Sequence, residues 1–248
     1  MARRLFFVER IHGGECELTG DRAHHLRTVL RVEQGQTFEV SDNERVYLAE
    51  VRTVRKDRVV FRLIEGAAAR VAPVRLALLA ALVKFDRMEM LLEKAAELGT
   101  ERVTLVAAER SESGLERGAG KRMERWRRII LEASQQARRA RLPDLDGPAS
   151  FAKAVGVPAD YRYLLDESGK ASPLLACLPQ RRLVSDAVAL LVGPEGGWTE
   201  EERREAARAG WRPVSLGPQI LRAETAAIAA LAVVGCAWAP PSVPPGDQ

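Results

Sequence analysis

The alternation of strand-like and helix-like segments after Pro73 constrains the fold of this chain most strongly. Short apolar runs rich in β-branched residues alternate there with longer segments of helical periodicity. The expected strands are Val74–Val83, Val103–Ala107, Tyr161–Leu165, Val188–Val192 and Pro213–Leu216. The expected helices lie near Arg87–Leu98, Lys121–Ala140, Glu200–Ala209 and Ala223–Trp238. Such alternation is typical of an α/β domain with a mostly parallel sheet and flanking helices.

Capping signals mark several of these helix ends. Capping boxes are predicted at two starts, Asp86 with Glu89 and Thr199 with Glu202. Gly99 and Gly210 stand where two helices are expected to end. These signals fix the ends of helices that periodicity alone leaves open.

Residues 1–70 predict a separate, small β-rich domain. Its expected strands are Thr37–Val40, Val46–Val54 and Val59–Ile64. A short helix is expected over Asp21–Leu30, with Asp21 as its N-cap. Residues 65–73 have linker composition. The sequence therefore predicts two domains, residues 1–70 and residues 71–248.

Composition narrows the class of protein. The three cysteines form no C-x-x-C pair, and the three histidines lie near the N-terminus, so we expect neither a disulfide framework nor a metal site. No apolar stretch has the length of a transmembrane helix, and no signal-peptide pattern begins the chain. We therefore expect a cytoplasmic protein that does not enter a membrane.

Basic residues concentrate between Arg110 and Arg141. This segment holds ten lysines and arginines against four acidic residues, whereas the whole chain has a net charge of only +4. Arginine suits phosphate recognition because its guanidinium is a planar fork of donors. The segment indicates a nucleic-acid partner. A solvated helix face is the alternative interpretation.

Strong catalytic motifs are absent from the sequence. It has no G-x-x-x-x-G-K-[ST] phosphate loop, no G-x-G-x-x-G after a strand and no G-x-S-x-G nucleophile elbow. A nucleotide-binding hydrolase would need such a cradle or nucleophile. Two other segments stand out instead, Leu190–Thr199 and Ser215–Thr225.

The first segment is an apolar strand that ends in Gly-Pro-Glu-Gly-Gly before a capped helix. Pro194 restricts Gly193 to extended backbone, and Gly196 and Gly197 allow conformations closed to other residues. Ligands bind at such strand ends in α/β sheets. A tight turn whose glycines serve packing only is the alternative.

The second segment repeats this design and adds charged residues. Gly217-Pro218 follows a strand, and Arg222, Glu224 and Thr225 begin the next helix. Capping explains Glu224 and Thr225, since a helix N-terminus favours an acidic residue. It explains Arg222 less well, because a cation there needs a negative partner.

Both segments resemble the signature loops of the SPOUT, or trefoil-knot, methyltransferases. The chain as a whole resembles the small-subunit ribosomal RNA (uracil-N3) methyltransferases. The resemblance extends from about Arg4 to Leu231. Its motifs are His25–Arg31, Lys94–Gly99, Glu132–Pro143, Leu191–Gly197 and Leu216–Thr225.

This resemblance implies a PUA-like RNA-binding domain followed by a knotted α/β domain that forms homodimers. It implies S-adenosyl-L-methionine as the cofactor and a uridine of 16S ribosomal RNA in the small ribosomal subunit as the substrate. The residues expected to bind the cofactor are Leu165, Val192, Gly193, Gly197, Ser215, Leu216, Gly217, Leu221, Arg222 and Thr225. An RNA methyltransferase with another target site and a non-catalytic RNA-binding protein are the alternatives.

Methylation at N3 assigns roles to two charged residues. Arg222 is the first candidate to stabilise the uracil anion, and Glu195 is a candidate to accept the proton or orient the base. Glu195 as a simple turn residue is the competing interpretation. The residues expected to contact RNA are His25, Arg27, Arg31, Arg138 and Arg141. Arg138 and Arg141 are expected to share one face of the basic helix, three residues apart.

Overall fold

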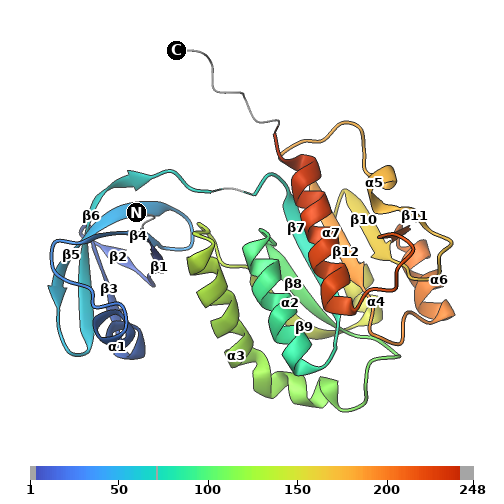
Figure 1. The fold of residues 1–248 in the computed structure, drawn as a ribbon, viewed down its shortest axis with the longest axis horizontal. Coiled ribbons are helices and arrows are strands. Elements are labelled where there is room, and N and C mark those ends of the chain that lie inside the picture. The colour runs from blue at the N-terminus through green and yellow to red at the C-terminus, as the bar shows by residue number, and fades with distance from the viewer. Residues whose placement is uncertain (1–3, 71, 241–248) are drawn as a thin grey trace. The chain divides into compact units, whose positions relative to one another are not determined.

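The computed structural model describes residues 4–70 and 72–240, which fold into two compact units. The first unit contains Met1–Val71 and Leu131–Leu142, and the second contains Ala72–Ile130 and Pro143–Gln248. The chain therefore enters the first unit twice, the second time at the end of helix α3 (Leu115–Gln136) (Figure 1).

The first unit is built on a six-stranded sheet with the order β1-β4-β5-β6-β3-β2. Its strands are β1 (Leu5–Phe7), β2 (Ile11–His12), β3 (Glu15–Thr19), β4 (Thr37–Ser41), β5 (Val46–Val54) and β6 (Arg58–Ala67). β1 runs parallel to β4, and the other neighbours are antiparallel. Helix α1 (Gly20–Thr28) packs on this sheet through Ala23 and Leu26. The β-rich first unit agrees with the sequence prediction.

Strand β1 is buried on both faces, which explains its unbroken apolar run. Phe6 packs in the main core of the unit, with its ring centroid 5.4 Å from that of Phe38. Leu5 and Phe7 point the other way and pack with Ala140. Residues 131–142 thus complete the first unit by covering a second apolar face.

The second unit contains a seven-stranded sheet with the order β11-β13-β10-β12-β7-β8-β9, and all its strand pairs are parallel. The strands are β7 (Arg75–Ala81), β8 (Arg102–Ala107), β9 (Asp144–Ser150), β10 (Tyr161–Leu165), β11 (Ser172–Pro173), β12 (Ala187–Val192) and β13 (Arg212–Ser215). The helices, besides α3, are α2 (Phe85–Glu97), α4 (Phe151–Val155), α5 (Leu174–Cys177), α6 (Glu200–Arg208) and α7 (Ala223–Trp238). The predicted mostly parallel α/β fold is confirmed.

Two strands of this sheet were not predicted from the sequence, because they lie at its edges. β9 reads Asp-Leu-Asp-Gly-Pro-Ala-Ser, and Leu145 is its one fully buried side chain. β11 has only two residues, both exposed. An edge strand buries little and tolerates proline, so neither strand shows the apolar pattern of a central one.

The observed helix ends confirm three of the four predicted capping signals and contradict one. The Thr199–Glu202 capping box is present at the start of α6. Gly99 and Gly210 have φ of +89° and +81°, as helix-terminating glycines do. The Asp86 capping box is wrong, because α2 already begins at Phe85 after Lys84. Asp86 instead lies in the first turn, where its charge suits the helix dipole.

Helix α1 departs from its prediction in the same way. It begins at Gly20 after Thr19, so Asp21 is a first-turn residue and not the N-cap. No helix in the described part of the chain is long and apolar enough to cross a membrane.

Candidate functional site

A pocket of about 140 Å³ lies at the carboxyl ends of β10, β12 and β13. Its walls come from the three loops that follow these strands and from the start of α7. The lining residues are Leu165, Asp166, Glu167, Gly169, Val192, Gly193, Pro194, Glu195, Gly197, Val214, Leu216, Gly217, Pro218, Gln219, Ile220, Leu221, Ala223 and Ala226. The carboxyl edge of a parallel sheet is where α/β proteins bind ligands.

The loop after β12 is locked in place by a buried tryptophan. Trp198 is 1% exposed, and its indole N–H donates to the carbonyl of Leu165 at 3.3 Å. A Cβ on Gly193 would lie 3.1 Å from the indole ring. Glycine at this position therefore lets the strand end pass close to the tryptophan.

Close contacts with neighbouring residues also explain the next two glycines, Gly196 and Gly197. A Cβ on Gly196 would lie 2.9 Å from the Cβ of Arg110, whose guanidinium donates to the Gly196 carbonyl at 3.2 Å. Gly197 has a φ of +68°, and its Cβ would lie 2.3 Å from a carboxylate oxygen of Glu167. Packing thus accounts for Gly193 and Gly196, whereas Gly197 combines a left-handed backbone with a position in the pocket wall.

An acidic turn after β10 forms the part of the pocket wall next to Gly197. The Asp166 and Glu167 carboxylates lie 2.6 and 3.0 Å from the guanidinium nitrogens of Arg203, on α6. Burial disfavours the charged form of Asp166. The hydrogen bond from the Ser168 backbone and the contact with Arg203 outweigh it and lower the pKa of Asp166. This turn was not predicted from the sequence, although its place directly after a predicted strand was a usable signal.

The loop after β13 is held far less tightly. Gly217 has a φ of +120°, and Ile220 is 86% exposed. Arg222 is the N-cap residue of α7 and is exposed, and its side chain makes no ion pair or hydrogen bond with another described residue. Glu224 is 6% exposed, and its Oε2 has no hydrogen-bond partner among these residues. Glu224 is therefore not the negative partner that Arg222 needs.

The structure brings most of the predicted cofactor residues together. Those that line the pocket are Leu165, Val192, Gly193, Gly197, Leu216, Gly217 and Leu221. Ser215, Arg222 and Thr225 border the pocket in sequence without lining it. Helical geometry explains Thr225, because Ala223 and Ala226 present the inward face of the first turn of α7.

Glu195 lines the pocket and is anchored by an arginine from another element. Its carboxylate lies 2.6 Å from a guanidinium nitrogen of Arg87, on α2. Arg87 was not predicted from the sequence, since the two residues are 108 positions apart in the chain. The contact between Glu195 and Arg87 therefore joins the loop after β12 to helix α2 at the pocket wall.

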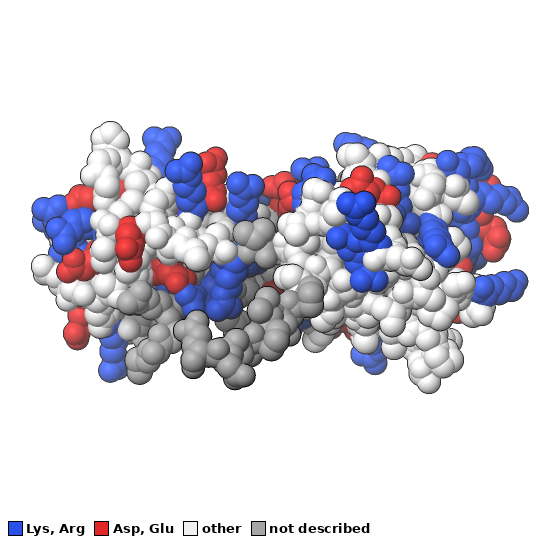
Figure 2. All heavy atoms as spheres, turned by 90° about the horizontal axis from the view of Figure 1, so that it is seen from above, with Lys and Arg blue, Asp and Glu red and all other residues white. Residues whose placement is uncertain are grey.

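The predicted RNA-binding residues all lie in the first unit. His25 and Arg27, on α1, are exposed, as are Arg31, just beyond the helix, and Arg141. Arg138 is engaged instead, because its Nε donates to Glu39 at 3.0 Å and a second nitrogen contacts the same carboxylate. Figure 2 shows basic and acidic side chains interspersed on the face that it presents.

The expected helical relation of Arg138 and Arg141 is wrong. Helix α3 ends at Gln136, and Arg138 has a φ of +55°, so the two residues do not share a helical face. The arginine-rich sequence pattern continues past the helix end, and residues 131–142 turn into the first unit there. Periodicity alone could not show this end.

The chemistry of the pocket wall fits some ligands and not others. Leu165, Val192, Leu216 and Leu221 supply apolar surface for a flat ring, and the strand ends supply backbone polar groups. The charged residues in the lining are Asp166, Glu167 and Glu195, and no lysine, arginine or histidine of the described chain lines the pocket. Such a wall suits a ligand with hydroxyl groups or positive charge and disfavours a polyphosphate.

Comparison with known proteins identifies the class to which this fold and pocket belong. The family model of the RNA methyltransferase domain matches residues 70–235, and that of the RNA methyltransferase PUA domain matches residues 18–64. The fold and the strand-end pocket thus define an RNA methyltransferase.

Individual relatives place the chain more narrowly. Ribosomal RNA small subunit methyltransferase E of Synechocystis sp. is 33% identical over 94% of this chain and 77% of the relative. The protein of that name from Bacillus subtilis is 30% identical over 88% of each. The chain belongs to the ribosomal RNA small subunit methyltransferase E family.

Solved structures agree with this placement. Ribosomal RNA small subunit methyltransferase E of Neisseria gonorrhoeae, bound to S-adenosyl methionine, superposes with a TM-score of 0.85 at 28% identity, over 96% of this chain and 98% of that one. A putative methyltransferase of Legionella pneumophila in complex with the same cofactor gives 0.85 at 30% identity, with the same coverage. The resemblance on which the sequence interpretation rested is confirmed.

Proposed function

We propose that this protein transfers a methyl group from S-adenosyl-L-methionine to N3 of a uridine in 16S ribosomal RNA. The observation that carries the proposal is the pocket at the carboxyl ends of β10, β12 and β13, in a chain that belongs to this methyltransferase family. The relatives' names supply the ribosomal RNA of the small subunit as the substrate class.

The pocket residues fit the cofactor. The apolar residues Leu165, Val192 and Leu216 would hold its adenine ring, and the backbone around Gly197 and Gly217 would hold its polar groups. Both glycines have positive φ, which brings backbone rather than side chain to the ligand. The bound cofactor supplies the methyl group, and the chain's own residues supply position and charge.

Arg222 is the residue that we assign to the reacting base. N3 gives up its proton, to a base or to water, before it bonds to the methyl carbon. Until that bond forms, negative charge spreads over O2, N3 and O4. A guanidinium at the start of α7 can donate to this anion, and Arg222 is exposed beside the pocket with no partner of its own among the described residues. The ion pair with Arg87 favours an orienting role for Glu195 over proton acceptance.

The target uridine has to be unpaired, because N3 lies on its Watson–Crick edge. We assign the capture of the RNA strand to the first unit, through His25, Arg27, Arg31 and Arg141, which are exposed. The RNA-binding domain would then be residues 1–70 together with residues 131–142, and the remaining chain would be the methyltransferase domain.

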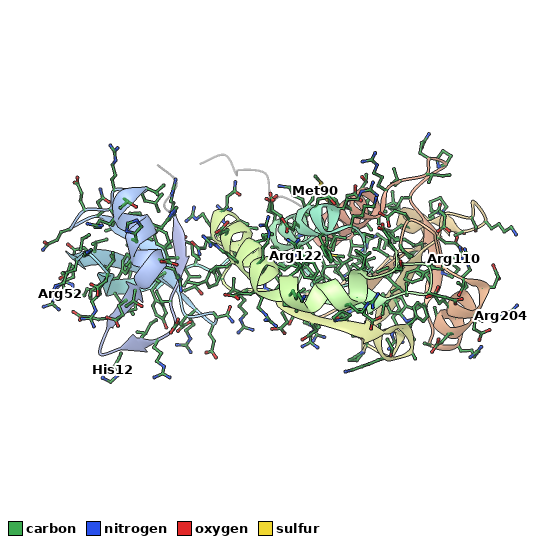
Figure 3. The ribbon with its side chains drawn as sticks, turned by 90° about the horizontal axis from the view of Figure 1, so that it is seen from below. His12, Arg52, Met90, Arg110, Arg122 and Arg204 are labelled. Atoms are coloured by element: carbon green, nitrogen blue, oxygen red, sulfur yellow. The ribbon has the colours of Figure 1, made fainter. Side chains whose placement is uncertain are left out.

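We further propose a cytoplasmic homodimer that works on the small ribosomal subunit. Helices α2 and α7 pack on each other (Figure 1), and support for the dimer comes from the apolar side chains that this packing leaves uncovered. Met90, on α2, is 52% exposed (Figure 3), and Ile228, Ala229 and Val233, on α7, are only partly buried. A second copy of the chain would cover these side chains.

Mass spectrometry of nucleosides tests the proposal. Small subunits from a strain that lacks the gene are incubated with the purified protein and the cofactor, and their RNA is digested. We expect N3-methyluridine to appear among the nucleosides, with protein-free 16S RNA as the comparison substrate. A methyl group on another base or another atom would overturn the N3 assignment, and no transfer to either RNA would overturn the proposed substrate.

A further inference from the structure

The charge of the pocket wall has a consequence for the ligand. Asp166, Glu167 and Glu195 line the pocket, and no basic side chain of the described residues does. The arginines that pair with these carboxylates, Arg203 and Arg87, lie outside the lining. A bound ligand therefore contacts the carboxylates directly, whereas the guanidinium groups that pair with them lie outside the pocket lining.

The turn formed by Asp166 and Glu167 keeps an excess negative charge. Two carboxylates of this turn share the single guanidinium of Arg203, whose side chain is 20% exposed. The turn is also fixed by its backbone, since the Asp166 N–H donates to the carbonyl of Val214 at 2.8 Å and the Ser168 N–H donates to the Asp166 carboxylate at 2.8 Å. Its charge is thus held at one place in the wall.

Glu167 brings this charge to the glycine loop. One oxygen of its carboxylate lies only 2.3 Å from the position that a Cβ on Gly197 would take. Glu167 is partly open, with 46% of its side chain exposed, and it borders the pocket. Its charge can therefore act on a bound molecule without being fully neutralised by Arg203.

We infer that the turn of Asp166 and Glu167, positioned by Arg203, makes the pocket select the cationic cofactor over its neutral product. This inference rests on the proposed function. S-adenosylmethionine has a sulfonium cation, and loss of the methyl group leaves the uncharged thioether of S-adenosylhomocysteine. A wall with excess negative charge holds the first more tightly than the second, which favours exchange of product for fresh cofactor after each transfer.

Calorimetric titration of Glu167→Gln against three ligands tests the inference. The ligands are S-adenosylmethionine, S-adenosylhomocysteine and sinefungin, an analogue that has an amine where the cofactor has its methylsulfonium. A unit charge at roughly 6 Å, in an effective dielectric constant of about 40–80, changes a binding constant by about three- to tenfold. We expect this loss for the two cations and a loss below about twofold for S-adenosylhomocysteine.

Glu200→Gln is the matched control. Glu200 also faces Arg203, at 3.9 Å, but it is 81% exposed and does not line the pocket, so the preference should stay unchanged. Glu167→Asp keeps the charge and should keep most of the preference. Glu195→Gln, on a different loop, should lower the preference for the two cations less than Glu167→Gln does, because Glu195 has the guanidinium of Arg87 to itself among the described residues.

Three results would overturn the inference. They are equal losses for all three ligands in Glu167→Gln, no loss for any, and the same change in Glu200→Gln. Failure of the unaltered protein to bind either S-adenosylmethionine or S-adenosylhomocysteine would instead overturn the cofactor assignment of the proposed function. The two failures are therefore distinguishable.

Discussion

The loops after β12 and β13 share a Gly-Pro start and a helix that follows, yet they are held very differently. Residues 193–199 are fixed by the buried ring of Trp198, by the hydrogen bond from Arg110 and by the capping box of Thr199 and Glu202. In residues 217–222, no side chain makes a hydrogen bond or ion pair with another part of the described chain.

This difference indicates a division of labour between the two loops. The first loop presents a preformed wall, because Gly193 and Gly196 lie directly against Trp198 and Arg110. The second loop has few internal restraints, and its exposed Ile220 and Arg222 are free to contact cofactor and RNA. Substitutions in the first loop should therefore damage cofactor binding, and substitution of Arg222 in the second loop should damage catalysis.

Gly197→Val should have the largest effect on this division. The new side chain requires a left-handed backbone that valine resists, and its Cβ meets the Glu167 carboxylate. We expect calorimetric affinity for the cofactor to fall by about 30- to 150-fold, as two to three kcal/mol of strain imply. Gly13→Val, which shares the positive φ but has open space around it, should leave affinity unchanged. Normal affinity in a folded Gly197→Val protein would remove this glycine from the site.

Arg222→Lys tests the catalytic half of the comparison. The charge remains, but the planar fork of donors is lost, so kcat should fall on the order of 10–1000-fold while the cofactor Kd changes little. Because Arg222 has no partner in the described chain, Tm should not move. Arg181→Lys, also exposed and without a partner among the described residues, is the control. A fall in cofactor affinity instead would assign Arg222 to the cofactor carboxylate, and a normal kcat would end its catalytic assignment.

A combined substitution in the first unit should leave both loops intact. Replacing His25, Arg27 and Arg31 by alanine should weaken RNA binding at low salt. It should also flatten the salt dependence, by about one charge for each phosphate that the variant no longer binds. Cofactor affinity should stay the same. Arg62→Ala, which removes an arginine paired with Glu50, is the control. An unchanged salt dependence in the triple variant would contradict the RNA-binding role.

Acid should remove a small part of the stability of the pocket wall. The pKa of Asp166 is lowered below its ordinary value of 3.8, so its pairing stabilises the folded protein above that pH. The contribution disappears as the pH falls through the lowered pKa. Asp166→Asn should therefore be less stable than the unaltered protein at pH 7, by about 1 kcal/mol, and the two melting curves should converge in acid. Glu200→Gln should show no such convergence, and a constant gap for Asp166→Asn would refute the pairing.

The sequence predicted the central strands and both strand-end loops, because each of these segments shows a recognisable pattern in its own residues. Tyr161–Leu165 matches strand β10 as found, and the capping box at Thr199 is present. Edge strand β9 was not predicted, because Leu145 is its only buried residue and the strand shows no apolar pattern. Local signals are strongest where a segment is buried on both faces.

Contacts between distant parts of the chain could not be predicted in the same way. The pair of Arg138 and Glu39 joins residues 99 positions apart, and that of Arg87 and Glu195 joins residues 108 positions apart. The first pairs Arg138, from the arginine-rich segment, with Glu39 on β4, and the second anchors the pocket residue Glu195. Both depend on the folded arrangement of elements whose separate sequences give no hint of the partner.

Hydrogen exchange with and without S-adenosylmethionine tests most directly the claim that these two loops form the cofactor site. In the free protein, the Gly197 amide, which donates to the Pro194 carbonyl at 2.9 Å, should exchange slowly, and the amides of residues 217–222 should exchange quickly. The cofactor should slow exchange in both loops, and most of all in residues 217–222, while α1 stays unchanged. Protection that appears elsewhere and leaves both loops unaffected would contradict the account.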